Sequence, residues 1–88
     1  MTRFEIERKV TSMLRNYTDS NEKVDMLSPY DIPAEELDLD SLDTASLLQE
    51  IEEKFCIRMS NTLAERFGKL RLNEIVSEIK FQTDRKAG

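Results

Sequence analysis

The sequence predicts a small all-α protein: a bundle of three longer helices and one short helix, with a long first loop. Its composition is dominated by the helix formers Leu, Glu, Lys, Arg and Ala, whereas β-branched and aromatic residues are sparse. Apolar residues recur at helical spacing in three segments, and the chain has only two glycines and two prolines. With 88 residues, of which 39% are hydrophobic, the chain is expected to form one domain around one modest core.

The first helix is expected over residues 2–17. Its apolar side chains lie on one helical stripe, with Phe4 near the start: Ile6, Val10, Met13, Leu14 and Tyr17. The following run of turn formers, residues 16–21, predicts the end of this helix.

From the end of this run to Leu37 the chain shows no sustained periodicity, and it forms the predicted long loop. Pro29 and Pro33 disfavour helix at Ser28 and Ile32. A loop of this length usually carries a function or packs onto the core, and its apolar side chains favour packing. A short turn of helix is expected near residues 34–37.

The second helix is expected from Ser41 to Lys54 or Phe55. Either Asp40 or Ser41 can serve as its N-cap, and Asp43 falls in the first turn, where a negative charge is favourable. The predicted inner stripe has Leu47 at its margin and comprises Leu42, Ala45, Leu48, Ile51 and Phe55.

The C-terminal third is expected to hold a connector, a short helix and a third long helix. Thr62 and Glu65 have capping-box spacing, and Gly68 fits the position after a helix end. The last helix is expected over residues 72–81, with Leu72, Ile75, Val76 and Ile79 on one face. The domain is therefore expected over residues 1–82, followed by a flexible tail over residues 83–88. The further core candidates are Ile57, Met59, Leu63 and Phe67.

Charge is unevenly distributed along this chain, whose formal net charge is −5. Residues 31–53 contain no Lys or Arg, and their acids are Asp31, Glu35, Glu36, Asp38, Asp40, Asp43, Glu50, Glu52 and Glu53. Such a negative segment disfavours nucleic acid and favours a basic protein surface as partner. The expected contacts are Asp40, Leu42, Asp43, Glu50 and Glu53. The simpler interpretation is a solvated face.

Several classes of protein are disfavoured by residues that the chain lacks. It has no histidine, and its one cysteine allows no internal disulfide. Cys56 is expected to be a half-buried structural thiol. Asp38, Asp40 and Asp43 do not complete a calcium loop, because Gln49 stands where the closing glutamate belongs. We therefore expect no catalytic residue and no metal site. No signal peptide or membrane span is visible, so a cytoplasmic monomer is expected.

The segment Leu37-Asp38-Leu39-Asp40-Ser41-Leu42-Asp43, followed by Leu47, residues 51–55 and Ile57, resembles the acyl carrier proteins. The resemblance extends from the first helix to about Ile79. It implies that Ser41 carries 4′-phosphopantetheine, which a phosphopantetheinyl transferase attaches from coenzyme A. Such a phosphoprotein holds acyl groups as thioesters on the terminal thiol. It also implies that the apolar interior can shelter the acyl chain.

The expected function is thus a non-catalytic carrier for fatty-acid, polyketide or related lipid biosynthesis. Its partners would be acyl-transferring, ketosynthase-like or ligase enzymes with basic docking patches. A specialised carrier is indicated by departures from the family pattern at Asp38, Leu39, Ala45, Ser46, Cys56, Arg58, Asn61 and Arg66. Two alternatives stay open: an interaction module of the same fold without a prosthetic group, and a peptidyl or aminoacyl carrier.

Overall fold

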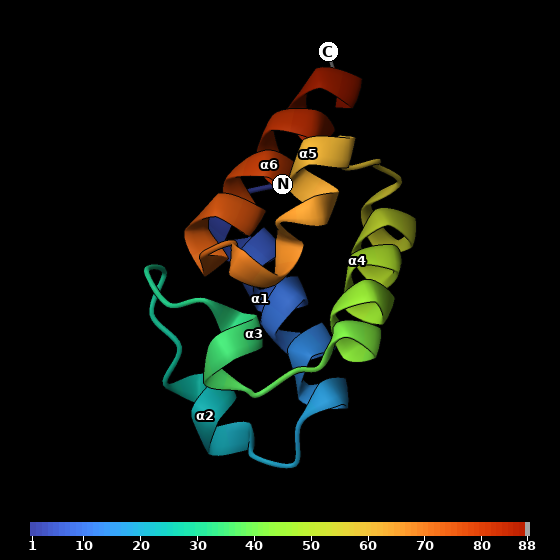
Figure 1. Ribbon diagram of the computed structural model, residues 1–88. Helices are drawn as coiled ribbons and strands as arrows, with labels where there is room; N and C mark the ends of the chain where they lie inside the picture. Colours follow the sequence, from blue (N-terminus) through green and yellow to red (C-terminus); the bar gives the residue numbers. More distant parts are fainter. Residues whose placement is uncertain (88) are drawn as a thin grey trace.

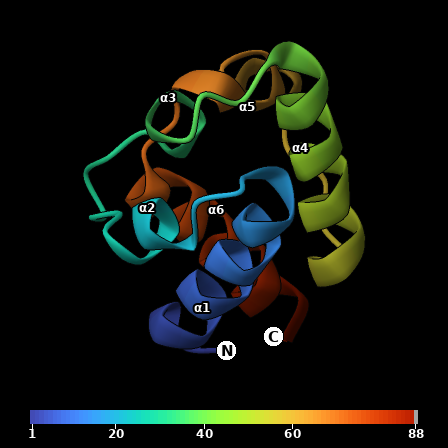
Figure 2. The ribbon, with the colours of Figure 1, turned by 90° about the horizontal axis from the view of Figure 1, so that it is seen from below.

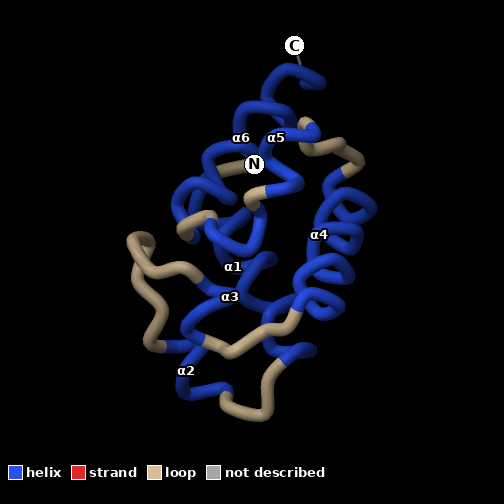
Figure 3. Tube along the Cα trace, viewed as in Figure 1, coloured by secondary structure: helices blue, strands red, loops and turns tan. Residues whose placement is uncertain are grey.

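A computed structural model describes residues 1–87, which are helical with connecting loops and contain no strand (Figures 1 and 3). The long helices are α1 (Arg3–Leu14), α4 (Ser41–Phe55) and α6 (Leu72–Ala87). The short elements are α2 (Asn21–Asp25), α3 (Pro33–Glu36), α5 (Asn61–Glu65) and two 3₁₀ turns, η1 (Arg15–Tyr17) and η2 (Phe67–Lys69). The predicted all-α bundle of three long helices is confirmed, but it has three short α-helices among residues 1–87, where one short helix and a short turn of helix were predicted.

Helix α1 begins with a capping box formed by Thr2 and Glu5, which have the required spacing of three residues in the sequence. The Thr2 hydroxyl accepts a hydrogen bond from the Glu5 backbone N–H at 3.1 Å, and the Glu5 carboxylate accepts one from the Thr2 N–H at 3.2 Å. The hydrogen bonds from the Thr2 backbone and then its hydroxyl lower the pKa of Glu5. The buried residues are Ile6, Val10, Met13 and Leu14, as the periodicity predicted.

The core lies where α1 and α6 pack side by side and α4 closes the other side (Figure 2). Arg3 of α1 links this helix to α6 by donating a hydrogen bond to the Ser77 hydroxyl at 2.9 Å. The predicted core residues Ile51, Phe55, Ile57, Met59, Phe67, Ile75 and Val76 are buried, and Leu48 and Leu63 pack against them while half-buried.

The predicted long loop contains two short helices, of which only α3 was expected. Ser20 caps α2 by accepting the Lys23 N–H at 3.3 Å, and Pro33 occupies the first turn of α3. Val24 and Leu37 are buried, which confirms that the loop packs onto the core, whereas Met26 and Tyr30 are 81% and 74% exposed.

The same loop is tied to the start of α6 by backbone hydrogen bonds. The N–H groups of Leu72 and Asn73 donate to the carbonyls of Asp31 and Pro29, each at 2.9 Å. The first N–H groups of a helix have no acceptor within the helix, so the loop supplies the missing acceptors. The Asp31 carboxylate in turn accepts the Ser28 N–H at 2.9 Å, which fixes the turn.

Helix α4 has the predicted bounds, but the predicted inner stripe is partly wrong. Its buried residues are Leu47, Ile51 and Phe55, whereas Leu42 is 76% exposed and Ala45 is exposed too. Successive residues of an α-helix are rotated by about 100° around its axis, so residues spaced three apart move gradually to another face. Ile51 lies nine residues after Leu42 and is therefore about 180° from it. The stripe that faces the core is therefore centred on Leu47, which the sequence placed at its margin.

The C-terminal third differs from the prediction in three details. The short helix α5 is capped by Ser60, which accepts the Leu63 N–H at 3.3 Å, so it starts one position before Thr62. Gly68 lies inside η2 with no positive φ, so it is not the residue that ends the helix. Helix α6 continues past Phe81 to Ala87. Residues 83–87 are thus helical, Gly88 lies outside the described residues, and the flexibility expected there stays a prediction.

Candidate functional site

Ser41 is the first residue of α4 and is exposed. The cap is Asp40, whose carboxylate accepts the Asp43 N–H at 2.7 Å. The Asp40 carbonyl accepts both the backbone N–H and the hydroxyl of Thr44. Because Asp40 performs the capping, the Ser41 hydroxyl is not needed for it, and no other residue in 1–87 hydrogen-bonds that hydroxyl. Ser41 therefore presents a free hydroxyl at the positive end of a helix.

The turn before Ser41 depends on a residue in the left-handed region. Asp38 has φ 54°, and it follows the end of α3 in a Schellman arrangement. The Asp38 N–H donates to the Glu35 carbonyl at 3.3 Å, and the Leu39 N–H donates to the Ala34 carbonyl at 2.9 Å. Glycine is the usual residue there, and aspartate is among the few others that tolerate the conformation. This turn sets the direction in which the chain enters α4.

A groove of about 440 Å³ opens beside Ser41. Ser41, Thr44 and Leu48 form one wall, from α4; Phe67 and Lys69, from η2, form the opposite wall. Leu39 and Ala64 also line it, so three segments distant in sequence meet there. Of the predicted acyl-pocket residues, only Ala45, Leu48 and Phe67 line this groove. Thr44 could have been predicted from its place one helical turn after Ser41, but no sequence signal points to Lys69.

The far wall of this groove carries one ion pair and lies close to α4. Lys69 pairs with Glu35 of α3 at 3.0 Å, with both side chains largely exposed. Such an exposed pair contributes at most about 1 kcal/mol. A Cβ added at Gly68 would meet the Thr44 methyl at 3.6 Å, which is ordinary van der Waals contact. Glycine is therefore not required here, and η2 approaches α4 closely.

The acids expected to bind partners do not share one face. Asp40, Glu53 and the apolar Leu42 are exposed, and Asp43 is half-buried. The half-buried Glu50 turns toward η1, where its carboxylate accepts the Tyr17 hydroxyl at 2.8 Å. Foremost through that hydrogen bond, and then through burial, the pKa of Tyr17 is raised to about 12. Glu52 likewise faces the protein and accepts the Met59 N–H at 2.8 Å. Part of the acidic segment therefore serves the fold.

Cys56 was predicted to be a half-buried thiol, but it is exposed, so this prediction is wrong. It ends α4 with φ 54°, and the Ile57 N–H donates to the Glu52 carbonyl at 3.0 Å. This is the same chain reversal as at Asp38, and glycine would adopt it with less strain.

Within residues 1–87, no three acidic or cysteine side chains converge in a way that could hold a metal ion. No helix of that part of the chain is long and apolar enough to cross a membrane. No family model, curated protein or solved structure matches the chain.

Proposed function

We propose that this protein is a carrier that holds acyl intermediates as thioesters on a 4′-phosphopantetheine arm attached to Ser41. The observation that supports it most directly is the free, exposed hydroxyl at the start of α4. No side chain of residues 1–87 accepts a hydrogen bond from this hydroxyl, which suits a substrate that an external transferase modifies rather than an activated nucleophile. The surrounding sequence, which resembles acyl carrier proteins, points to the same chemistry.

The residues around Ser41 fit a phosphodiester on its oxygen. The Asp40 carboxylate accepts the hydrogen bond from the Asp43 N–H. The N–H groups of Ser41 and Leu42, at the first helical positions, have no acceptor within α4 and could donate to a phosphate. The helix dipole favours a negative group there, and the exposed position leaves room for it. The prosthetic group would supply the thiol; the chain would supply the attachment oxygen and the docking surface.

The groove beside Ser41 suggests where a short acyl group would rest. It is lined by the apolar Leu39, Leu48 and Phe67, and its volume of about 440 Å³ is in the range of small-ligand sites, roughly 300–1,000 Å³. The exposed Leu42, next to Ser41, is suited to contact a phosphopantetheinyl transferase, a ketosynthase-like enzyme or a ligase. Asp40 and Glu53 would attract basic patches on such partners.

The deciding experiment is intact-mass measurement after incubation with coenzyme A and a broad-range phosphopantetheinyl transferase. We expect a mass increase of one phosphopantetheinyl group on the wild type and none on Ser41→Ala. Ser46→Ala is the matched control, because Ser46 is also exposed on α4. An unmodified wild type, or an unchanged adduct on Ser41→Ala, would contradict the proposal.

A second candidate function is an interaction module without a prosthetic group. It is favoured by Leu42, a large apolar side chain that is 76% exposed at the start of α4. In that case Ser41→Ala would leave partner binding unchanged, whereas Leu42→Ala would weaken it. Capture of partners with the two variants side by side separates the module from the carrier.

A further inference from the structure

Helix α6 carries a stripe of surface side chains whose charges follow a definite order along the helix. The stripe consists of Glu74, Glu78, Phe81 and Arg85, spaced by four, three and four residues. At about 100° per residue, these side chains fall within about 60° of one another around the helix axis. Glu78 is half-buried and the other three are exposed, Phe81 to 57%. Two negative charges therefore precede an apolar side chain, and a positive charge follows it.

A groove between α5 and α6 borders this stripe. It has a volume of about 440 Å³ and is lined by Leu63, Asn73, Glu74, Ser77, Glu78 and Phe81. The half-buried Leu63, from α5, adds a second apolar side chain beside Phe81. Figure 1 shows that the last turns of α6 extend beyond α5. The stripe and the groove thus form one surface on this side of the molecule.

The charges of the stripe have no opposite charge within the described chain. Across residues 1–87, the ion pairs are Arg15–Asp25, Lys69–Glu35 and Lys80–Asp84. Instead, the Glu74 carboxylate accepts the Arg71 backbone N–H at 2.8 Å, and the Glu78 carboxylate accepts the Gln82 amide at 3.0 Å. The Arg85 guanidinium lies over the aromatic ring of the stripe, 5.4 Å from its centroid. Each charged group is therefore positioned by a neutral group and lacks a counter-charge.

The stripe is complementary to a second copy of itself that runs in the opposite direction. With a two-fold axis between residues 79 and 80, Glu74 faces Arg85 of the second copy, and Arg85 faces its Glu74. The two Phe81 side chains then lie three residues apart along the helix axis, which is about 4.5 Å. Aromatic rings pack favourably at such separations.

We propose that this protein forms a homodimer in which the α6 stripes of two copies pack antiparallel. Two Glu74–Arg85 pairs flank the paired Phe81 rings, and Leu63 of each copy borders the rings. The sequence led us to expect a monomer, because exposed charge disfavours association. Along α6 the opposite charges are separated, and this separation favours association with an antiparallel copy. The proposal does not depend on the carrier function.

Charge also distinguishes a second copy from a helix of another protein. A basic helix would match Glu74 and Glu78 but would be repelled by Arg85. An acidic helix would match Arg85 and be repelled by the two glutamates. An antiparallel copy of α6 offers an opposite charge at both ends of the stripe.

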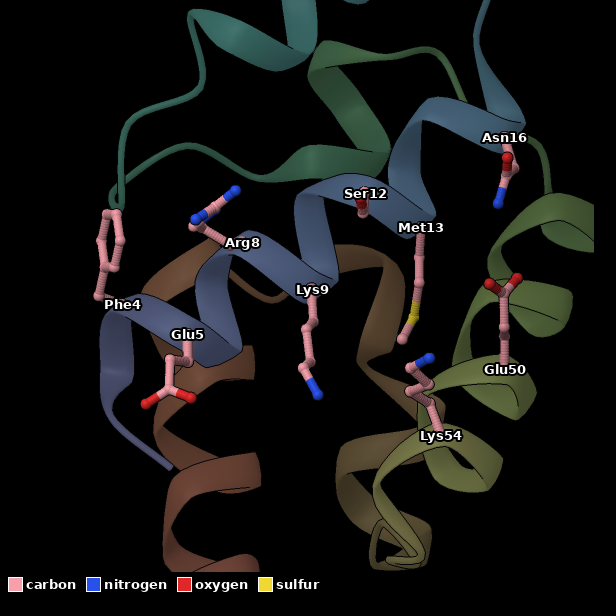
Figure 4. A pocket seen from close by; sticks show the side chains of 9 residues that line it. All are labelled: Phe4, Glu5, Arg8, Lys9, Ser12, Met13, Asn16, Glu50 and Lys54. Atoms are coloured by element: carbon pink, nitrogen blue, oxygen red, sulfur yellow. The ribbon is translucent and has the colours of Figure 1, made fainter.

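Helix α1 carries a stripe of the same spacing that lacks this complementarity. It consists of Phe4, Arg8, Thr11 and Arg15, and Arg8 lies 5.8 Å from the centroid of the Phe4 ring. Figure 4 shows Phe4 and Arg8 one turn apart on the same side of α1. Both charged residues of this stripe are bases, so an antiparallel copy would place no acid opposite them. The α1 stripe therefore provides a matched control.

The test is sedimentation equilibrium of the full-length protein from about 10 µM to 1 mM at low ionic strength. We expect the average mass to rise from the monomer value of 10.3 kDa toward twice that value. Added salt should weaken the dimer, because exposed ion pairs are screened. A mass that stays at the monomer value over the whole range would overturn the proposal. A monomer that binds a lysine-rich helical peptide would also overturn it and would assign the stripe to another protein.

Charge reversals test the antiparallel arrangement. In Glu74→Arg both ends of the stripe are basic and in Arg85→Glu both are acidic, so each variant alone should stay monomeric. An equimolar mixture restores both opposite-charge pairs and should form a heterodimer. Circular dichroism verifies that both variants are folded, since Glu74 also accepts the Arg71 N–H. Dimers of either variant alone, or no association in the mixture of folded variants, would contradict the arrangement.

Removal of the aromatic ring tests the centre of the contact. Phe81→Ser should raise the dissociation constant at least about tenfold, because the ring contacts are lost. Phe4→Ser removes a similarly exposed ring beside an arginine on α1 and should leave association unchanged. Equal weakening in the two variants would overturn the proposal. Ser41→Ala should dimerise normally, so this result is separate from the carrier test.

Discussion

The two halves of α4 look alike in sequence, because both mix acids with apolar residues, yet they behave differently. The first half exposes Leu42 and Ala45 and presents the free Ser41 hydroxyl. The second half buries Ile51 and Phe55, and its acids Glu50 and Glu52 are bonded to the rest of the protein. One helix thus serves as a presenting surface at its start and as a structural wall at its end.

The largest contrast between the halves should appear when an apolar side chain is removed from each. Ile51→Ala is expected to lower the free energy of unfolding by about 2–5 kcal/mol, because Ile51 is fully buried. Leu42→Ala should change it by less than about 0.5 kcal/mol. Urea denaturation followed by circular dichroism measures both. Equal losses would show that Leu42 also packs against the core.

The next largest effect is expected at the cap of the first half. Asp40→Ala removes the acceptor of the Asp43 N–H and should cost about 1 kcal/mol of stability. Glu53→Gln, at an exposed acid of the second half, should cost almost nothing and serves as the control. If Asp40→Ala leaves the free energy of unfolding unchanged in the same denaturation experiment, another group caps α4.

A similar or smaller loss is expected where the second half meets η1. Tyr17→Phe removes the hydrogen bond to Glu50 and should cost about 1 kcal/mol at neutral pH. The bond also makes stability depend on pH. The folded protein holds the Tyr17 proton up to a pKa of about 12, while the unfolded chain releases it near 10.0. This contribution is therefore complete below pH 10 and is lost as the pH rises toward 12.

A titration of tyrosine absorbance can check this pH dependence directly. In a Tyr30→Phe background, only Tyr17 contributes, and its pKa should be about 12. Glu50→Gln should move it down toward 10, because the charged acceptor is gone. A Tyr17 pKa that does not change with Glu50→Gln would contradict the hydrogen bond.

The smallest expected effects have the opposite sign and concern the turns that flank α4. Asp38→Gly and Cys56→Gly should each raise the free energy of unfolding, by up to about 1 kcal/mol, because both residues have φ 54°. Asp38→Ala should lower it. Thermal unfolding of the three variants gives the ranking. Stabilisation at Cys56 but not at Asp38 would show that the aspartate already relieves the strain before Ser41.

Much of the fold could be predicted from periodicity and capping residues. The bounds of α4 can be predicted from the N-cap Asp40 and from the apolar spacing up to Phe55. Helix α1 can be predicted because its apolar residues all lie on one face. The rotation of α4 could not be predicted in the same way, because its apolar residues cover too wide an arc. Leu42 and Leu47 fit two different stripes, and only packing against the core selects the second.

The candidate site was predictable in its centre and not at its edges. Ser41 stood out because a serine followed acids at a helix start, and the structure places it there, exposed. The opposite wall of its groove, from Phe67 to Lys69, depends on how η2 packs against Thr44, and tertiary contacts leave no local signal. The hydrogen bond from the Tyr17 hydroxyl to Glu50 is a contact of the same kind.

The hydrogen bonds from the Leu72 and Asn73 N–H groups to the long loop mean that the exchange of these two amides depends on whether the loop is in place. Amides in the first turn of a helix ordinarily exchange quickly with solvent deuterium, but these two have acceptors at Asp31 and Pro29. Their exchange rates therefore report how often residues 29–31 lift away from α6. A partner that grips or displaces the loop would be detected at these two positions, remote in sequence from where it binds.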